Sequence, residues 1–121
     1  MFGLLDSDIA TIKKILEEFP EVKRSAIFGS RAKGNYRNGS DVDIAILSNN
    51  LSLDTILTIS SRLNEDTLMP YRFDVLNYQT IANKELIQHI DRVGKVFFEE
   101  TIPVVQEPDL KFGGKTIDKK N

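Results

Sequence analysis

The sequence predicts a small single-domain α/β protein in which helices pack around one β-sheet. Segments whose apolar residues recur at helical spacing alternate with short apolar runs rich in strand-forming residues, which is the pattern of an α/β fold. The chain has 121 residues, of which 40% are apolar and 28% charged, so it can bury one hydrophobic core. We assign this domain to residues 1–100.

The first part of the chain is expected to contain a helix, a strand and a short second helix. The helix is predicted at 6–19, because polar residues suited to capping precede a run of apolar residues at helical spacing and Pro20 then ends it. A strand rich in apolar residues follows at 22–28. A short helix is predicted at 30–33, before a turn at 35–39 that contains Asn-Gly.

The second part continues the alternation. A strand, a helix, a strand, a helix and a strand are predicted in turn, at 41–47, at 52–63, at 71–76, from 80 or 83 to 92, and at 95–99. Gly94 closes the last helix. After residue 100 the pattern ends, because residues 101–121 hold two prolines, paired glycines and a charged end. We expect this tail to be poorly packed or to act as a partner-binding arm.

Composition excludes several classes of protein. The net charge is −2, with 16 basic and 18 acidic residues, so direct binding of nucleic acid is not expected. The absence of cysteine removes disulfides, thiolate metal sites and cysteine nucleophiles, and the one histidine, His89, is expected to be solvated rather than a ligand. Apolar runs are too short to span a membrane and the start lacks a secretory leader, so we expect a cytoplasmic protein.

Two aspartates open the strand predicted at 41–47. Side chains alternate along a strand, so Asp41 and Asp43 are expected on one face, with Val42 and Ile44 on the other. Adjacent carboxylates repel each other unless a cation lies between them, and Mg²⁺ prefers such oxygen ligands together with phosphates. The alternative is that both are surface residues at the end of a strand.

Gly29 and Ser30 form a turn between a predicted strand and a predicted helix. Glycine permits close approach of the backbone to a phosphate, and a helix start offers free N–H groups. The alternative is a simple helix cap. The pair gains weight from its spacing, because ten residues separate Ser30 from Asp41 and one separates Asp41 from Asp43.

Asp74 lies within the apolar strand predicted at 71–76. A carboxylate buried there without a partner would be destabilising by several kcal/mol. Asp74 is therefore expected to ligate metal with Asp41 and Asp43, or to act as the base that deprotonates an attacking hydroxyl. A salt bridge to a basic residue of a helix is the alternative.

The combination of Gly29-Ser30, Asp41-Val42-Asp43 and Asp74 resembles the DNA polymerase β-type nucleotidyltransferase superfamily. Within it, "GSRAKGNYRNGSDVDIAI" is similar to the minimal nucleotidyltransferases, the small branch often paired with a HEPN-domain protein. The resemblance covers about residues 19–99. It implies a mixed β-sheet flanked by helices, a nucleoside triphosphate, usually ATP, and two Mg²⁺ ions.

The resemblance also implies roles for individual residues. Gly29 and Ser30 would hold the triphosphate, and Asp41, Asp43 and Asp74 would ligate metal, with Asp74 assisting deprotonation of the acceptor. Apart from the resemblance, Arg31 or Lys33 could bind the nucleotide by neutralising triphosphate charge, and the alternative is that each is a solvated surface residue. The AMP group would go to a tyrosine of a small all-helical HEPN ribonuclease toxin, so that this chain acts as the antitoxin.

Two other functions remain open at this point. The chain could be a non-catalytic subunit that neutralises or presents its partner by binding alone, although three mutually repelling carboxylates would then serve no purpose. It could instead modify a small hydroxylated molecule, although the short chain leaves little sequence for an acceptor pocket.

Overall fold

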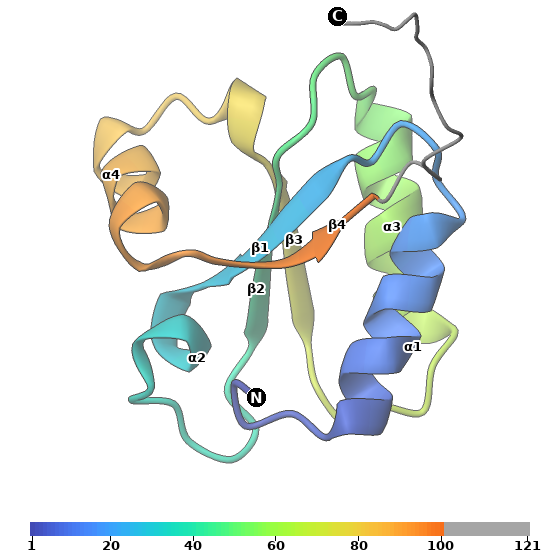
Figure 1. Cartoon of the computed structure of the whole chain (residues 1–121), viewed down its shortest axis with the longest axis vertical. Coiled ribbons are helices and arrows are strands. Elements are labelled where there is room, and N and C mark those ends of the chain that lie inside the picture. Colours follow the sequence, from blue (N-terminus) through green and yellow to red (C-terminus); the bar gives the residue numbers. More distant parts are fainter. Residues whose placement is uncertain (101–121) are drawn as a thin grey trace, which may run out of the picture.

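A computed structural model describes residues 1–100 of the chain. These residues form four helices, one short 3₁₀ segment and four strands (Figure 1). In chain order the elements are α1 (Asp6–Glu17), β1 (Arg24–Phe28), α2 (Gly29–Lys33), β2 (Val42–Ile46), α3 (Leu53–Glu65), β3 (Phe73–Asn77), η1 (Tyr78–Thr80), α4 (Lys84–Val93) and β4 (Lys95–Glu99).

The four strands make one mixed sheet in the order β3-β2-β1-β4. β1 pairs antiparallel with both β2 and β4, whereas β2 and β3 run parallel. The parallel pair places the start of β3 beside the start of β2, and the antiparallel pair places the end of β1 there as well. The α/β fold and the mixed sheet are thus confirmed. The end of β1 and the starts of β2 and β3 lie side by side at one end of the strands.

Helices cover both faces of the sheet (Figure 1). On one face the larger core packs against α1 and α3; it includes Ile12, Leu16, Ile27, Val42, Ile44, Ile46, Ile59, Leu63 and Phe73. On the other face α4 contributes Ile90, which packs with Phe28 and Ala45. Val42 and Ile44 thus lie on the face opposite Asp43, as predicted for the second strand.

Several predicted boundaries differ from those observed. Asp41 was expected inside the second strand but precedes it, because β2 begins at Val42. Ser52 and Asn83 are the residues that cap α3 and α4, since their side chains accept the backbone N–H groups of Thr55 and Leu86. The expectation of a poorly packed or partner-binding tail at 101–121 lies outside the described residues.

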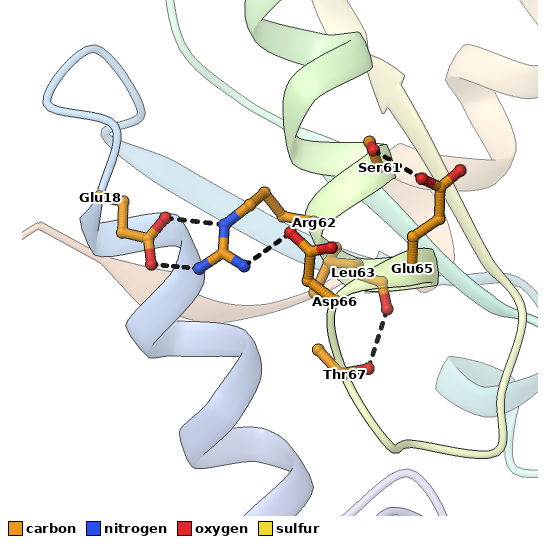
Figure 2. A network of polar contacts seen from close by, with 7 residues as sticks. All are labelled: Glu18, Ser61, Arg62, Leu63, Glu65, Asp66 and Thr67. Atoms are coloured by element: carbon orange, nitrogen blue, oxygen red, sulfur yellow. Dashed lines mark hydrogen bonds and ion pairs between the residues drawn. The ribbon is translucent and has the colours of Figure 1, made fainter.

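Helices α1 and α3 are joined at the surface by Arg62 (Figure 2). Its Nε donates to Glu18 at 3.0 Å, and its Nη1 donates to Asp66 at 3.1 Å. The guanidinium holds the pKa of Glu18 below its ordinary value by this hydrogen bond. Because these groups are largely exposed to solvent, the network contributes little to the stability of the fold.

Among the described helices none has the length and apolar character required to cross a bilayer.

Candidate active site

The candidate site lies where β1 ends and β2 and β3 begin. Phe28 at the end of β1 pairs with Asp43 of β2, and Asp43 pairs in turn with Asp74 of β3. Gly29 follows Phe28 directly. The predicted glycine turn and two of the three predicted carboxylates are therefore neighbours across three strands, although Asp74 is 31 residues from Asp43 in the chain.

The three aspartates differ in burial. Asp43 is half-buried on the face of the sheet that also carries Ala45 and Phe28, while Asp41 and Asp74 are exposed. Asp41 lies just outside β2, at the end of the loop that follows α2. Asp43 is therefore the central carboxylate, with Asp41 and Asp74 closer to solvent.

Asp43 has the strongly perturbed carboxyl group of the site. Its pKa is raised to about 6, first because burial disfavours the charged form, and then because Asp74 and Asp41 repel it. Arg31 partly offsets this rise. A carboxylate held at this proton affinity has a corresponding tendency to bind another cation.

Gly29 is required by the close approach of Asp43. Its φ angle is +73°, a conformation that side chains other than glycine rarely adopt. A Cβ added at this position would overlap the Oδ2 atom of Asp43. Two independent constraints therefore require glycine at position 29: its backbone conformation and the carboxylate beside it.

The start of α2 has backbone N–H groups without a side-chain cap, next to the Asp43 carboxylate. Phe28 precedes the helix in an extended conformation, and no side chain of the described residues caps the first N–H groups. Ser30 is half-buried at the same end. Free N–H groups and a hydroxyl beside an acidic cluster can bind an anion, provided that a cation neutralises the carboxylates.

The donor set suits Mg²⁺ in its chemistry, because carboxylate oxygens and phosphates are the ligands this ion prefers. The Gly29–Asp43 contact also holds one carboxylate beside the turn expected to bind phosphate. However, no three acidic or histidine side chains within residues 1–100 form a ready-made metal cage. Metal binding by Asp41, Asp43 and Asp74 together therefore remains a prediction, which the bound nucleotide would help to complete.

Arg31 has contacts different from those expected. It was predicted to meet the triphosphate, but the residue is only 3% exposed. Its Nε and Nη2 donate to the Ser40 carbonyl at 3.1 and 2.9 Å, and its Nη1 donates to the Phe2 carbonyl at 2.9 Å. Three of the five guanidinium N–H groups are thus bound to backbone carbonyls, which favours a structural role, and binding of the nucleotide by Arg31 stays a prediction.

Three residues around Arg31 have roles that the sequence analysis did not find. The rings of Tyr36 and Tyr71 lie 5.2 and 5.0 Å from the guanidinium carbon, and the Tyr71 hydroxyl donates to buried Asp8 at 2.9 Å. These residues are far from one another in the sequence, so no local pattern predicts that they meet. The available signal was a basic residue directly after Gly29-Ser30 in a short helix that packs on the sheet.

His89 also differs from its expectation. It is half-buried on α4 and its ring meets the ring of Phe28 edge-on, with centroids 6.2 Å apart. This contact packs α4 against the residue that precedes Gly29. The contact gives His89 a role in packing α4 on the sheet.

Comparisons with known proteins show the family of this chain. The sequence model of the family Polymerase beta, Nucleotidyltransferase matches residues 10–102. A protein of Haemophilus influenzae described as "Probable protein adenylyltransferase MntA" is 32% identical over 113 residues, which cover 88% of this chain and 95% of that protein.

Solved structures show the same fold. A chain in the crystal structure of a toxin–antitoxin with AMP-PNP matches with a TM-score of 0.64 and 23% identity, over 79% of this chain and 75% of that one. A chain in a complex of tri-AMPylated Shewanella oneidensis HEPN toxin with MNT antitoxin matches with a TM-score of 0.59 and 21% identity, over 78% and 71%.

The family match spans most of the chain and includes Gly29, Asp43 and Asp74, the residues that the fold brings together. This chain therefore belongs to the polymerase beta nucleotidyltransferase family, and it is a nucleotidyltransferase.

Proposed function

We propose that this chain uses Mg²⁺ and ATP to transfer AMP to a tyrosine hydroxyl of a small helical HEPN-type ribonuclease toxin, and so acts as its antitoxin. The observation that carries the proposal is the position of Asp43. This half-buried carboxylate lies against Gly29 on one side and pairs with Asp74 on the other. Such an arrangement places a metal-binding group between an anion-binding turn and a second acid.

The residues of the chain have separate tasks in this reaction. The N–H groups at Gly29 and Ser30 would bind the terminal phosphates, and Asp41 and Asp43 would hold the metal ions that accompany them. When bound, two Mg²⁺ ions supply charge stabilisation for the attacking and leaving oxygens. The exposed carboxylate of Asp74 is open to an acceptor and would receive the proton of its hydroxyl.

The transfer forms one bond and breaks one, and it needs no reactant besides ATP and the acceptor. The acceptor oxygen forms a bond to the α-phosphorus of ATP while the bond from that phosphorus to the bridging oxygen breaks. Pyrophosphate leaves with the electron pair of the broken bond, and the hydroxyl proton passes to Asp74. The product is a phosphodiester between the acceptor oxygen and AMP.

The identity of the donor and acceptor rests on the relatives. The Haemophilus influenzae protein is described as a protein adenylyltransferase, and the Shewanella oneidensis complex holds an AMPylated HEPN toxin with its MNT antitoxin. Both support AMP as the group transferred, and the Shewanella oneidensis complex supports a HEPN protein as the acceptor. A cytoplasmic location is consistent with ATP as substrate and with a chain that has no cysteine.

The test is transfer of label to a purified helical HEPN partner. The chain is incubated with that partner, Mg²⁺ and, in separate reactions, each of the four nucleoside triphosphates labelled at the α-phosphate. We expect label on the partner from ATP, and none when its acceptor tyrosine is replaced by phenylalanine. Labelling of a small hydroxylated molecule in place of the partner would contradict the proposed acceptor.

The site is tested by the variant that combines Asp41→Asn and Asp43→Asn. It should abolish transfer while circular dichroism and partner binding stay unchanged. A matched control combines Asp6→Asn and Asp54→Asn, which remove the same charge from two exposed positions in the first turns of α1 and α3. Full transfer by the site variant would show that these carboxylates are not the catalytic groups.

A further inference from the structure

Arg31 is a buried cation that forms no direct ion pair with a carboxylate among the described residues, although its charge attracts Asp43 at longer range. It is 3% exposed, and the ion pairs formed within residues 1–100 do not include it. Burial of an unpaired guanidinium is unfavourable unless other groups replace its hydration. Other groups of the protein must therefore replace the water that would surround this guanidinium.

Two kinds of contact replace the hydration of Arg31. Three donor atoms meet two backbone carbonyls, those of Ser40 and Phe2. The rings of Tyr36 and Tyr71 also lie within the range of cation–π attraction. The planar guanidinium, with its fork of donors, can make all of these contacts at once, which an ammonium cannot.

The tyrosines are themselves held in place. The Tyr71 hydroxyl donates to Oδ2 of Asp8, and the same oxygen accepts the backbone N–H of Leu5 at 3.0 Å. The ring of Tyr36 packs on Gly3 so closely that a Cβ there would overlap it. The segment before α1, the loop after α2 and the segment before β3 thus converge on Arg31.

The position of Arg31 in the chain gives this network a function. Its backbone follows Gly29 and Ser30, the turn proposed to bind phosphate. Its side chain donates two hydrogen bonds to the carbonyl of Ser40, the residue that precedes Asp41. Asp41 lies outside β2 and lacks the strand pairing that fixes Asp43. Ser40 also exchanges hydrogen bonds with Arg37 within the same loop, but the bonds from Arg31 connect this peptide directly to the residue that follows the turn.

We propose that Arg31 is a positioning residue, which sets Asp41 at the distance from the Gly29-Ser30 turn that a metal ion bound to a triphosphate requires. The inference rests on the proposed function of this site. It differs from direct binding of the triphosphate, in which the positive charge alone would matter. Residues behind metal ligands commonly affect metal affinity by 10- to 100-fold.

Arg31→Lys separates the two roles because it keeps the charge but loses the fork of donors. We expect the half-saturating Mg²⁺ concentration to rise by about tenfold and the rate at saturating ATP to fall, with little change in the KM for ATP. Arg24→Met is the control, since it removes an exposed arginine at the other end of β1. It should leave both quantities unchanged.

Binding of Mn²⁺, followed by electron paramagnetic resonance with a non-hydrolysable ATP analogue, gives a readout that needs no transfer. Wild type should bind about tenfold more tightly than Arg31→Lys. If wild type binds Mn²⁺ but transfers no label, the proposed function is wrong, and the positioning role is judged on binding alone. If Arg31→Lys binds Mn²⁺ and transfers label as wild type does, or raises only the KM for ATP, the positioning role is overturned.

Tyr36→Leu provides a second test of the network in case Arg31→Lys does not fold. Tyr36 lies at the surface, so its replacement removes one ring from Arg31 without leaving a buried polar group. We expect a smaller weakening of Mn²⁺ binding in the same direction. Unchanged Mn²⁺ binding in a folded Tyr36→Leu protein would count against the network.

Discussion

Asp43 and Asp74 lie directly opposite each other in the parallel pair formed by β2 and β3. Like charges opposite each other in a sheet are destabilising, and Asp74 contributes to the rise of the Asp43 pKa to about 6. The pair therefore lowers the stability of the fold and concentrates negative charge at this end of the sheet. The predictions below follow from this relationship and from the contacts around it.

Asp43→Asn should stabilise the protein in the absence of divalent metal. The substitution removes a half-buried charge and its repulsion by Asp74 and Asp41. Allowing for screening by solvent, we expect the free energy of unfolding at pH 7.5 to rise by about 1 kcal/mol, measured by urea denaturation in EDTA. Mg²⁺ with an ATP analogue should then stabilise wild type and leave the variant unchanged. A less stable variant in EDTA would contradict this account of the site.

The stability of metal-free wild type should fall as the pH rises from about 4 to about 6. The pKa of Asp43 is 3.8 ordinarily and about 6 when folded, so the folded state binds the proton more tightly. The contribution of this group is fully present below about pH 4 and lost as the pH passes 6. The difference in unfolding free energy between wild type and Asp43→Asn isolates it, because other groups cancel. A difference that does not vary between pH 4 and 7 would refute the raised pKa.

Affinity for Mn²⁺ should show the opposite trend. The metal competes with the proton for Asp43, so affinity should increase through pH 6 and level off above it. Titrations between pH 5 and 8 measure this directly. Asp41→Asn should weaken binding and also shift the midpoint to lower pH, because Asp41 contributes to the raised pKa of Asp43.

Gly29→Ala and Gly34→Ala form a matched pair at the two ends of α2. Both glycines have positive φ, +73° and +86°, so each alanine should be destabilising by about 1 kcal/mol from backbone strain. A Cβ at Gly34 meets open space, whereas one at Gly29 overlaps the Asp43 carboxylate. We therefore expect Gly29→Ala to be the more destabilising and to abolish transfer, and Gly34→Ala to retain it. Equal loss of stability and activity in both would refute the special role of Gly29.

Ser25→Ala and Ser48→Ala should have opposite effects on stability. Both serines are buried, but the Ser25 hydroxyl has no partner among the described residues, whereas the Ser48 hydroxyl accepts the Lys23 N–H at 2.6 Å. Ser25→Ala should leave the unfolding free energy unchanged or raise it, and Ser48→Ala should lower it by about 1 kcal/mol. Thermal denaturation of both variants, with transfer unaffected, provides the measurement. Clear destabilisation by Ser25→Ala would indicate a partner for its hydroxyl.

Local periodicity accounts for the parts of the fold that the sequence predicted well. Helical and strand spacing are properties of near neighbours, so the elements were found in the correct order. The alternation around Val42, Asp43 and Ile44 also predicted correctly that the carboxylate and the core residues take opposite faces of the sheet. The carboxylates and the glycine turn could be named for the same reason, because their spacing along the chain is itself the signal.

The tertiary structure decided what depends on partners distant in sequence. The register that sets Asp43 beside Asp74, the end of β2 that leaves Asp41 outside the strand, and the contact between Gly29 and Asp43 are fixed by strand pairing. Arg31 shows the same limit, since a cation after a glycine turn suits a phosphate as well as it suits the carbonyls of Phe2 and Ser40. Spacing along a chain fixes which way a side chain points, but only long-range packing fixes what it meets there.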